Sequence, residues 1–423
     1  MTLSLPRRRL LQAASALPVL GFPLIARAAG AKVLVIGGGF GGATAARYLK
    51  RADPSLQVTL VERDKSFITC PFSNGVIGGL WGMKKITHGY DAVRKRGITV
   101  VHDEVVKLEP GTLKATLKGG KTLAADRVIV APGIDIRWGT LAGYDEAAAK
   151  AMPHAWKAGA QTTLLRKQLE QMPDGGVVLM SAPPNPFRCP PGPYERACMI
   201  GHHLKTRKPK SKLLILDAKD AISKQPLFVQ AWEQLYKGIV EWVPLSKDGK
   251  VTRVDVKEMT LHTEFTKHKG AVVNVIPPQF AGKIARDAGL ADQTGWCPVD
   301  PKTFESKLQK GVYVIGDAAI AGAMPKSGNA ANSHGKVAAY AIAAALAGKP
   351  PGDPTLGNTC YSIAAPDYGF SVTDTYKVNA DGQIAPVKDS GGISPRGAPE
   401  AQYAQEARFA ENWYKAITAE MFA

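Results

Sequence analysis

Residues 32–42 read KVLVIGGGFGG, and this stretch decides the fold class. It predicts a buried strand that passes through a glycine turn into a helix. Gly37, Gly39 and Gly42 have the spacing of a dinucleotide-binding turn. The first glycine permits the tight turn, the second lets the backbone approach a pyrophosphate, and the third lets helix and strand pack closely. Because a helix amino end favours negative charge, the stretch predicts a cradle for the phosphates of a dinucleotide.

The surrounding sequence supports that prediction and favours FAD over NAD. Residues 58–62 (VTLVE) form a second expected strand, and its terminal Glu62 suits the ribose hydroxyls. Residues 127–133 (RVIVAPG) resemble the strand and small-residue turn that close the first domain of FAD-containing disulfide reductases. Residues 311–317 (GVYVIGD) resemble the late strand of such enzymes, in which Gly316 and Asp317 would contact the ribityl chain. The FAD-binding domain is therefore predicted to be split by an insertion.

The inserted segment resembles a second dinucleotide domain that lacks its cradle. Residues 174–181 read as a first strand and residues 212–217 as a second strand that ends in an acid. Between them, the glycine turn is replaced by residues 182–196, APPNPFRCPPGPYER. Prolines offer no backbone N–H to a phosphate. We therefore expect that NAD(P)H is not the natural reductant.

An Ala-rich helix is expected over residues 330–347, after the segment 325–328 (PKSG). Its positive amino end would stabilise a reduced, anionic flavin, or the helix only packs against the first domain.

The first 29 residues read as an export signal. Arg7, Arg8 and Arg9 precede an apolar stretch over residues 13–25, and residues 26–28 (ARA) resemble a cleavage site. The stretch is shorter than the ~20 residues that a membrane span needs. The order Arg-Arg-x-Leu-Leu resembles a twin-arginine signal, which predicts a periplasmic protein that is exported folded. An ordinary secretory signal or an uncleaved anchor are the alternatives.

The net charge and the cysteine content limit the kinds of partner and cofactor that we expect. The formal net charge is +18, but no nucleic-acid-binding signature accompanies the scattered lysines, so we expect a solvated face that steers anions. The five cysteines are an odd number, so at least one is free or otherwise bonded. No Cys-x-x-Cys-His motif occurs, so no c-type haem is expected on this chain, and no metal-ligand cluster is expected either.

Several segments together resemble the flavoprotein subunits of flavocytochrome c sulfide dehydrogenases, over essentially the whole mature chain. They are residues 69–70 (TC), 155–159 (AWKAG), 187–196 (FRCPPGPYER), 295–300 (GWCPVD), 325–328 (PKSG) and 358–362 (NTCYS). The resemblance implies an FAD enzyme that oxidises hydrosulfide to sulfur or polysulfide. It also implies a separate c-type cytochrome subunit that carries the haem and receives the electrons.

The same resemblance implies roles for particular residues. Cys70 would be bonded through sulfur to the 8α-methyl of FAD, or it is a free cysteine. Cys189 and Cys360 would form a redox-active disulfide beside the flavin, or a purely structural one. Hydrosulfide would attack one of these two sulfurs to give a persulfide, and the released thiolate would reduce the flavin. Glu195 would act as an acid–base group or only pair with Arg188 or Arg196.

One tryptophan is expected at the active site, and two further cysteines are expected to take no part in it. Trp413 matches an active-site tryptophan of the family. Cys198 and Cys297 are expected to be buried and inert, because cysteine is among the residue types most often buried.

The C-terminal segment predicts a docked amphipathic helix. Its apolar positions recur at helical spacing and comprise Tyr403, Ala407, Ala410, Tyr414, Ile417 and Met421. We expect this face to pack on the FAD-binding domain, and no membrane insertion is expected, because a long apolar patch is missing.

These features predict an α/β protein with two Rossmann-like dinucleotide-binding domains of the glutathione-reductase type and a C-terminal α+β domain. The predicted ranges are 1–29 for the signal, 30–143 with 279–350 for the FAD-binding domain, 144–278 for the second domain and 351–423 for the C-terminal interface domain. Two alternative functions stay open: a sulfide:quinone oxidoreductase, which needs a quinone channel and membrane association, and a non-catalytic flavoprotein partner of a sulfur-oxidising complex, which would not turn over sulfide.

Overall fold

The first sheet holds the strand that the glycine turn follows. The computed structural model describes residues 30–423, so the predicted signal, residues 1–29, lies outside the described residues. The sheet is parallel, with strand order β20-β9-β1-β2-β5. Its strands are β1 (Lys32–Ile36), β2 (Gln57–Val61), β5 (Thr99–Val101), β9 (Arg127–Val130) and β20 (Val312–Val314). Because β20 joins β9 from far along the chain, the sheet is completed only after the inserted domain.

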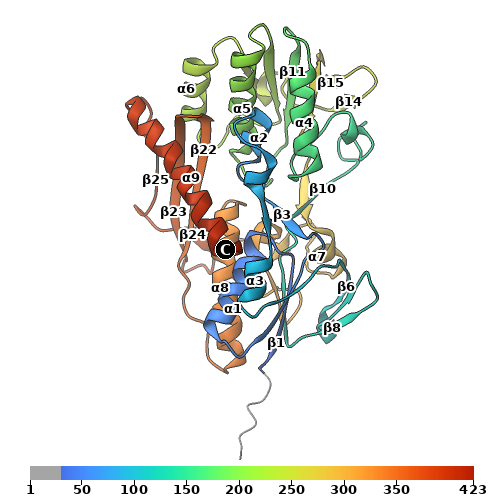
Figure 1. The fold of residues 1–423 in the computed structure, drawn as a ribbon, viewed down its shortest axis with the longest axis vertical. Helices are drawn as coiled ribbons and strands as arrows, with labels where there is room; N and C mark the ends of the chain where they lie inside the picture. The colour runs from blue at the N-terminus through green and yellow to red at the C-terminus, as the bar shows by residue number, and fades with distance from the viewer. Residues whose placement is uncertain (1–29) are drawn as a thin grey trace, which may run out of the picture.

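Two helices pack closely on this sheet. Helix α1 (Phe40–Ala52) follows the glycine turn, and α8 (Gly328–Leu346) lies beside it (Figure 1). Their backbones approach so closely that a Cβ on Gly335 would lie 2.6 Å from the carbonyl oxygen of Gly41. The contact brings the amino ends of both helices to the same edge of the sheet.

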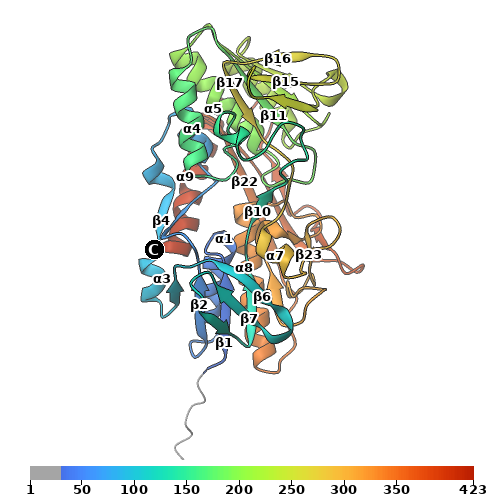
Figure 2. The same ribbon diagram turned by 90° about the vertical axis from the view of Figure 1, so that its right-hand side faces the viewer.

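The second sheet repeats the parallel pattern at the other end of the molecule (Figure 2). Its strand order is β13-β12-β11-β17. The strands are β11 (Val177–Ala182), β12 (Lys212–Asp217), β13 (Val240–Val243) and β17 (Val272–Val275), and the helices are α4 (Ala160–Gln171), α5 (Gly192–Arg207) and α6 (Gln225–Leu235). A small antiparallel sheet of β14 (Arg253–Asp255), β15 (Thr260–His262) and β16 (Lys267–Lys269) flanks it.

The C-terminal segment adds an antiparallel sheet and a long helix. The sheet contains β22 (Leu356–Ala365), β23 (Tyr368–Val378), β24 (Ile384–Pro386) and β25 (Gly392–Ile393). Helix α9 (Glu400–Phe422) buries all six positions of its predicted apolar face. Tyr414 of this face contacts Thr69 and His88 of the first domain, whereas the ring of Tyr403 stacks on Tyr368 of β23. The helix therefore joins the C-terminal sheet to the FAD-binding domain, as expected.

The remaining elements are short connections. Strands β10 (Ile134–Ile136) and β18 (Gln279–Ala281) pair where the chain leaves the first domain and returns to it. The others are β3 (Ser66–Ile68), α2 (Ser73–Gly78), β4 (Thr87–Gly89), α3 (Asp91–Lys95), β6 (Val105–Glu109), β7 (Lys114–Leu117), β8 (Thr122–Ala124), α7 (Lys283–Asp287), β19 (Cys297–Pro298) and β21 (Ala319–Ile320), with 3-10 helices at Met83–Ile86, Pro110–Thr112, Ala148–Lys150, Leu245–Lys247 and Gly316–Ala318.

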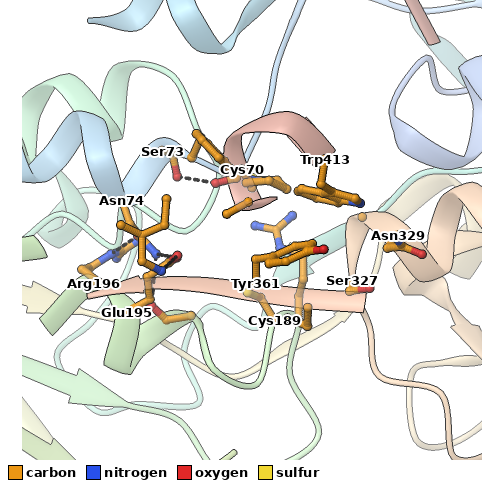
Figure 3. Close-up of a pocket in the computed structure, with 18 of the residues that line it drawn as sticks. Cys70, Ser73, Asn74, Cys189, Glu195, Arg196, Ser327, Asn329, Tyr361 and Trp413 are labelled. Atoms are coloured by element: carbon orange, nitrogen blue, oxygen red, sulfur yellow. Dashed lines mark hydrogen bonds between the residues drawn. The ribbon is translucent and has the colours of Figure 1, made fainter. Parts of the chain in front are cut away.

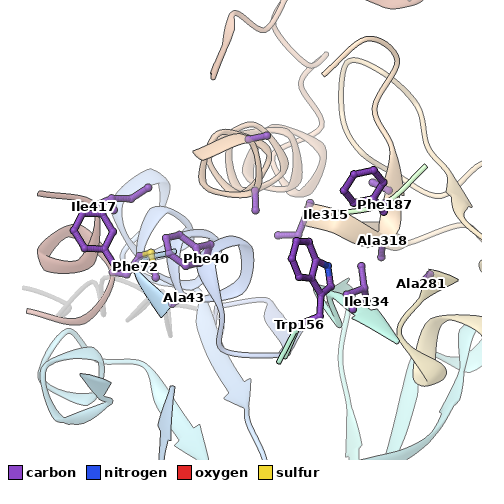
Figure 4. Packing of buried hydrophobic residues seen from close by; sticks show 14 of the residues in the cluster. Phe40, Ala43, Phe72, Ile134, Trp156, Phe187, Ala281, Ile315, Ala318 and Ile417 are labelled. Atoms are coloured by element: carbon purple, nitrogen blue, oxygen red, sulfur yellow. The ribbon is translucent and has the colours of Figure 1, made fainter. Parts of the chain in front are cut away.

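One large buried core runs through all three parts of the chain. Figure 4 shows Ile417 of α9 beside Phe72, which precedes α2, and Phe40 of α1 next to them. Trp156 lies near Ile315 and Ile134 in the same view. The predicted fold class is confirmed: two parallel Rossmann-like sheets are followed by an α+β unit. The residue ranges that we assign to the domains stay a prediction. Within residues 30–423, no helix combines the length and apolar character required to cross a membrane.

Candidate functional site

A groove of about 810 Å³ opens at the glycine turn of the first sheet. Most of the predicted cofactor-binding residues line it, namely Gly37, Gly39, Glu62, Cys70, Gly316 and Asp317. Gly42 lies behind the turn, where a Cβ would stand 1.8 Å from the carbonyl oxygen of Gly37. Gly37 itself has a φ of +97°, in the region that favours glycine. The local sequence thus forms the cradle for the reason that the spacing predicts.

The groove also presents polar groups that suit FAD. Glu62 accepts a hydrogen bond from the backbone N–H of Gly38 at 2.8 Å, which fixes the carboxylate beside the turn. In the described part of the chain, Oδ1 of Asp317 is buried and has no hydrogen-bond partner. Burial raises the pKa of Asp317, although Arg188 and Lys326 oppose the shift. An unpartnered buried carboxylate oxygen needs a donor, and a ribityl hydroxyl would supply one. These residues fit a flavin dinucleotide.

A second, smaller cavity of about 90 Å³ contains the three predicted functional cysteines, and we call it the cysteine pocket. Its lining includes Cys70, Cys189, Cys360, Glu195 and Trp413, which come from five separate segments of the chain (Figure 3). The structure thereby brings together all four predicted catalytic residues. Four residues line both this pocket and the groove, and so mark the junction of the two cavities: Cys70, Pro71, Arg188 and Gly328.

Cys70 is held at this junction by the loop that follows β3. Its carbonyl oxygen accepts hydrogen bonds from the N–H of Ser73 at 3.0 Å and from the Ser73 hydroxyl at 2.6 Å, where α2 begins. Its thiol donates a long hydrogen bond of 3.6 Å to the carbonyl oxygen of Trp156. The side chain is half-buried and faces the groove, which suits a bond to a bound flavin.

Cys189 is held in a constrained backbone position. Its φ is +57°, and its N–H donates to the carbonyl oxygen of Lys326 at 2.8 Å, just before α8. A Cβ on Gly192 would lie 2.9 Å from Sγ of Cys189, so only glycine fits at the start of α5. Burial, followed by the nearby Cys360 and Glu195, holds the pKa of the Cys189 thiol well above its usual range.

Cys360 faces the same pocket from strand β22. Burial raises the pKa of its thiol, while the positive charge of Lys224 opposes that shift. Both Cys189 and Cys360 are free thiols in the structure. Their common pocket is compatible with the expected redox pair, whereas the disulfide itself stays a prediction.

Glu195 lies in the first turn of α5 and is held by two hydrogen bonds. The amide of Asn74 donates to Oε2 at 2.7 Å, and the N–H of Ile363 donates to Oε1 at 3.0 Å. Burial raises the pKa of this carboxyl above its usual range. Among residues 30–423, neither Arg188 nor Arg196 forms an ion pair with it, so the purely structural pairing that we considered is not present.

The two arginines have other partners. Arg188 lies 4.0 Å from the Asp317 carboxylate and also donates to the carbonyl oxygen of Trp156. Arg196 is buried and donates to the side chain of Asn74 at 3.0 Å and to the carbonyl oxygen of Ala155 at 2.6 Å. Both arginines line the cysteine pocket and contribute positive charge to its wall.

Trp413 closes the pocket from helix α9. Its ring lies 6.0 Å from the ring of Tyr361 on β22. With the Asn329 amide in its hydrogen-bonding orientation, the indole N–H donates to the amide oxygen at 2.9 Å. Trp413 is thus fixed beside the amino end of α8.

Sequence reasoning missed two polar residues of this region. Asn74 orients both Glu195 and Arg196, and Lys224 contacts the strand that carries Cys360. Asn74 follows Cys70 closely, which is a weak signal. Lys224 is one of many lysines in a basic chain, so nothing in the sequence distinguishes it.

The acidic residue at the end of the second strand of the inserted domain is hydrogen-bonded within that domain. Asp217, at the end of β12, is fully buried and accepts hydrogen bonds from three side chains: Tyr194 at 2.7 Å, Trp242 at 3.1 Å and Lys219 at 2.6 Å. A carboxylate so engaged is not available to a ribose.

Cys198 and Cys297 are fully buried free thiols, as expected. Over residues 30–423, no group of three or more His, Cys, Asp or Glu side chains is arranged to hold a metal ion.

The fold and the site define a class of protein, the flavoproteins of the pyridine nucleotide-disulphide oxidoreductase type, whose family model matches residues 31–169. Two more specific models match two further regions of the chain. The central region of sulfide dehydrogenase (flavocytochrome c) flavoprotein chains matches residues 162–277, and the flavin-binding region of flavocytochrome c sulphide dehydrogenases matches residues 352–422. The chain belongs to the family of flavocytochrome c sulfide dehydrogenase flavoprotein chains.

Individual relatives include a flavoprotein chain of this family and sulfide:quinone oxidoreductases. The sulfide dehydrogenase flavoprotein chain of Chlorobaculum thiosulfatiphilum is 62% identical over 45 residues, which are 11% of this chain and 94% of that sequence. The mitochondrial sulfide:quinone oxidoreductase of Mus musculus is 23% identical over 303 residues, or 68% of this chain and 65% of the relative. The chain thus spans slightly less than two thirds of the mitochondrial relatives.

Solved structures show the same fold. The sulfide:quinone oxidoreductase of Aquifex aeolicus superimposes with a TM-score of 0.70 at 15% identity, covering 93% of this chain and 91% of the other. Putidaredoxin reductase, from its covalent complex with putidaredoxin, superimposes with a TM-score of 0.66 at 15% identity, covering 93% of this chain and 100% of the other.

Proposed function

We propose that this protein oxidises sulfide to sulfur or polysulfide with FAD as its cofactor, and that it passes the electrons to a c-type cytochrome subunit. One observation carries the proposal: Cys70, Cys189 and Cys360 line a single pocket that joins the dinucleotide groove. A sulfur nucleophile in this pocket would reach the cysteine pair and the flavin site without leaving the cavity.

The pocket suits a small anion. Its volume is about 90 Å³, and Arg188 and Arg196 contribute positive charge to its wall. The facing carboxyl of Glu195 is buried, and its raised pKa reduces the negative charge that it would add. Hydrosulfide, small and singly charged, is therefore favoured over larger or neutral substrates.

The proposed chemistry begins at the cysteine pair. Hydrosulfide attacks one sulfur of a Cys189–Cys360 disulfide, which leaves a persulfide on that cysteine and a thiolate on the other. Glu195, which Asn74 and Ile363 hold in place, lines the same pocket and would take up or release protons there. A flavin bound in the groove would accept the electron pair and release single electrons to the cytochrome.

Cys70 is proposed as the covalent attachment point, because it lines the groove and the cysteine pocket at once. A thioether bond there would raise the flavin potential and so favour electron transfer to the flavin. The twin-arginine-like signal supports a periplasmic protein that is exported with its cofactor.

NAD(P)H is not the proposed reductant. The fully occupied Asp217 and the proline-rich turn that precedes Cys189 support this view, because together they remove the ribose acceptor and the phosphate cradle of the second domain.

A sulfide:quinone oxidoreductase is the second candidate function. It is favoured by the similarity to mitochondrial enzymes of that name. Cytochrome c is preferred as acceptor because the two flavocytochrome-specific models together match the second domain and the C-terminal unit.

The test is sulfide-dependent reduction of cytochrome c by the purified holoprotein, with a soluble quinone as the competing acceptor. We expect cytochrome reduction that disappears in Cys360→Ser, with Cys198→Ser as a matched control that retains it. Quinone reduction without cytochrome reduction would transfer the assignment to the second candidate. Bound flavin with neither activity would contradict both and favour a non-catalytic role.

A further inference from the structure

Lys224 is a buried lysine that crosses from the second domain to the C-terminal sheet. It precedes α6 with a left-handed backbone, φ +56°, and the residue is 5% exposed. The ammonium group donates to the carbonyl oxygen of Cys360 at 2.8 Å and to the hydroxyl of Ser362 at 2.7 Å. It also lies 5.5 Å from the ring centre of Phe370. A single cation is thus fixed against the strand segment that carries Cys360.

The charge of Lys224 has no ion-pair partner. Within residues 30–423, no carboxylate lies within 4.0 Å of its ammonium nitrogen, whereas the buried Lys219 of the same domain pairs with Asp217 at 2.6 Å. A cation that is buried without a charged partner is destabilising, because the protein interior solvates it less well than water does. Burial accordingly lowers the pKa of Lys224, while Cys360, Glu195 and Cys189 act in the opposite direction. An anion that forms during the reaction would relieve this cost.

The charged and titratable groups around Cys360 come from four segments of the chain. Lys224 approaches it from the residue before α6, Glu195 from α5, Cys189 from the loop before α5 and Tyr376 from β23. Glu406 of α9 acts on Lys224 from further away. Lys224 is the cation that acts on Cys360, whereas Arg188 and Arg196, which line the same pocket, act on Cys70 and Cys189.

The second thiol, Cys189, is influenced by two cations, Arg188 first and Lys224 second. Arg188 is adjacent to Cys189, but its guanidinium already lies beside the Asp317 carboxylate at 4.0 Å and donates to the carbonyl oxygen of Trp156. Burial raises the pKa of both thiols, so the difference between them rests on their cations: Lys224 has no carboxylate partner, whereas Arg188 has one. A negative charge is therefore better accommodated on Cys360 than on Cys189.

We propose that Lys224 makes Cys360 the leaving group of the cysteine pair, so that hydrosulfide attacks Cys189. This inference rests on the proposed function and deepens it. The sulfur of hydrosulfide bonds to Sγ of Cys189, the Cys189–Cys360 bond breaks, and its electron pair goes to Sγ of Cys360. Cys189 then carries the persulfide with the hydrogen of hydrosulfide, Cys360 is a thiolate, and the total charge of −1 is unchanged. Lys224 acts through the strand and the local field, so it is a positioning residue.

The first experiment measures thiol ionisation without sulfide. The holoprotein is reduced, the reductant is removed, and the rates of iodoacetamide alkylation at Cys189 and Cys360 are followed by peptide mass spectrometry across a pH series. In the native sequence we expect Cys360 to react at lower pH than Cys189. Lys224→Met should slow Cys360 alkylation at neutral pH about tenfold, which corresponds to one pKa unit, and change Cys189 much less.

Two variants control for structural effects. Lys205→Met removes a lysine of the same domain that also donates to a carbonyl oxygen, that of Leu235 at 3.0 Å, but it does not line the pocket. Ser362→Ala removes one hydrogen-bond partner and leaves the cation in place. Both should keep the native pH profile of Cys360. If Lys224→Met does not fold, the native profile decides: Cys189 reacting at lower pH than Cys360 overturns the proposal.

The second experiment locates the persulfide. The oxidised holoprotein is treated anaerobically with one equivalent of sulfide, alkylated and digested. A persulfide on the Cys189 peptide supports the proposal, and a persulfide on the Cys360 peptide overturns it. If neither peptide carries one, the proposed function fails together with the assignment of a leaving group, while the alkylation profiles still report whether Lys224 sets the ionisation of Cys360.

Discussion

At the scale of single residues, the site combines thiols with groups that control their charge. Cys70, Cys189 and Cys360 lie in one pocket, Arg188 and Arg196 provide positive charge, and Glu195 is the buried acid. Burial raises the pKa of Glu195 and of both pocket thiols that face it. The uncharged forms of the carboxyl and of the two thiols are therefore favoured before a substrate binds. The two arginines would then stabilise an anion that enters the pocket.

The covalent attachment at Cys70 gives the first prediction. Cys70→Ser should leave the cavity unchanged and keep bound FAD, but release it on denaturation, because serine cannot form the thioether. The measurement is flavin absorbance in the filtrate and on the protein after acid denaturation. Cys297→Ser, which alters a buried thiol outside both cavities, should retain flavin on the protein. Flavin released from the unmodified protein would contradict the assignment.

Glu195 gives a prediction about stability and pH. Its pKa is raised in the folded protein, so the neutral form is stabilising, and this stability is present below the unfolded pKa and lost as pH rises through the folded pKa. Glu195→Gln should remove this dependence. Comparison of the melting temperatures of the two proteins should show that the native protein loses more stability than the variant above the usual glutamate range. Parallel curves would show that the carboxyl does not titrate there.

At the scale of elements, the cavity depends on how closely α1, α8 and the glycine turn approach one another. The turn could be predicted because its glycines are dictated by backbone geometry within a short stretch, residues 37–42. Asn74 and Lys224 could not, because their roles arise only when α2, α5, α6 and β22 pack together. The placement of Cys189 beside Cys360 likewise depended on the family resemblance, since nothing local in either segment specifies its partner.

Gly42 tests the element packing of the cradle. A methyl group at this position would lie 1.8 Å from the carbonyl oxygen of Gly37 and would force α1 away from the turn. Gly42→Ala should therefore yield protein with little or no bound flavin, measured as the ratio of flavin to protein absorbance. Gly111→Ala, at a position where a Cβ meets no atom within 4 Å, is the control and should bind flavin normally. Equal flavin content in both would contradict the cradle.

Helix α9 tests the packing of the C-terminal unit. Ile417 is buried on its predicted face, and Ile417→Ala should cost about 2–5 kcal/mol of unfolding free energy through the lost burial and the cavity. The measurement is chemical denaturation of the holoprotein. Lys415→Ala, on the exposed side of the same helix, should change stability by less than about 0.5 kcal/mol. If Ile417→Ala also changed stability by less than about 0.5 kcal/mol, the helix would be only loosely docked.

At the scale of the whole molecule, two joined cavities draw their residues from different parts of the fold. Most residues of the dinucleotide groove come from the first domain, with Lys157, Ala158 and Arg188 from the second, whereas the cysteine pocket takes residues from all three parts of the chain. Helix α9 connects these parts through Tyr414 and Tyr403, and it also supplies Trp413. The composition could predict an ordinary globular protein and a strong positive charge, but not which faces meet at the pocket.

The net charge provides the last prediction, which concerns the electron acceptor. The chain carries +18, and the predicted signal accounts for four arginines, so residues 30–423 carry +14. A field of this sign accelerates encounters with an acidic protein surface, and salt weakens it as the Debye length falls from about 10 Å at 0.1 M to about 3 Å at 1 M. We therefore expect kcat/KM for the native cytochrome to fall steeply with ionic strength, whereas the rate with an uncharged soluble quinone changes little. The quinone control separates docking from sulfide entry, because hydrosulfide must reach the same pocket in both assays. A salt-independent cytochrome reaction, or a quinone reaction that is faster at every salt concentration, would contradict an electrostatically docked cytochrome partner.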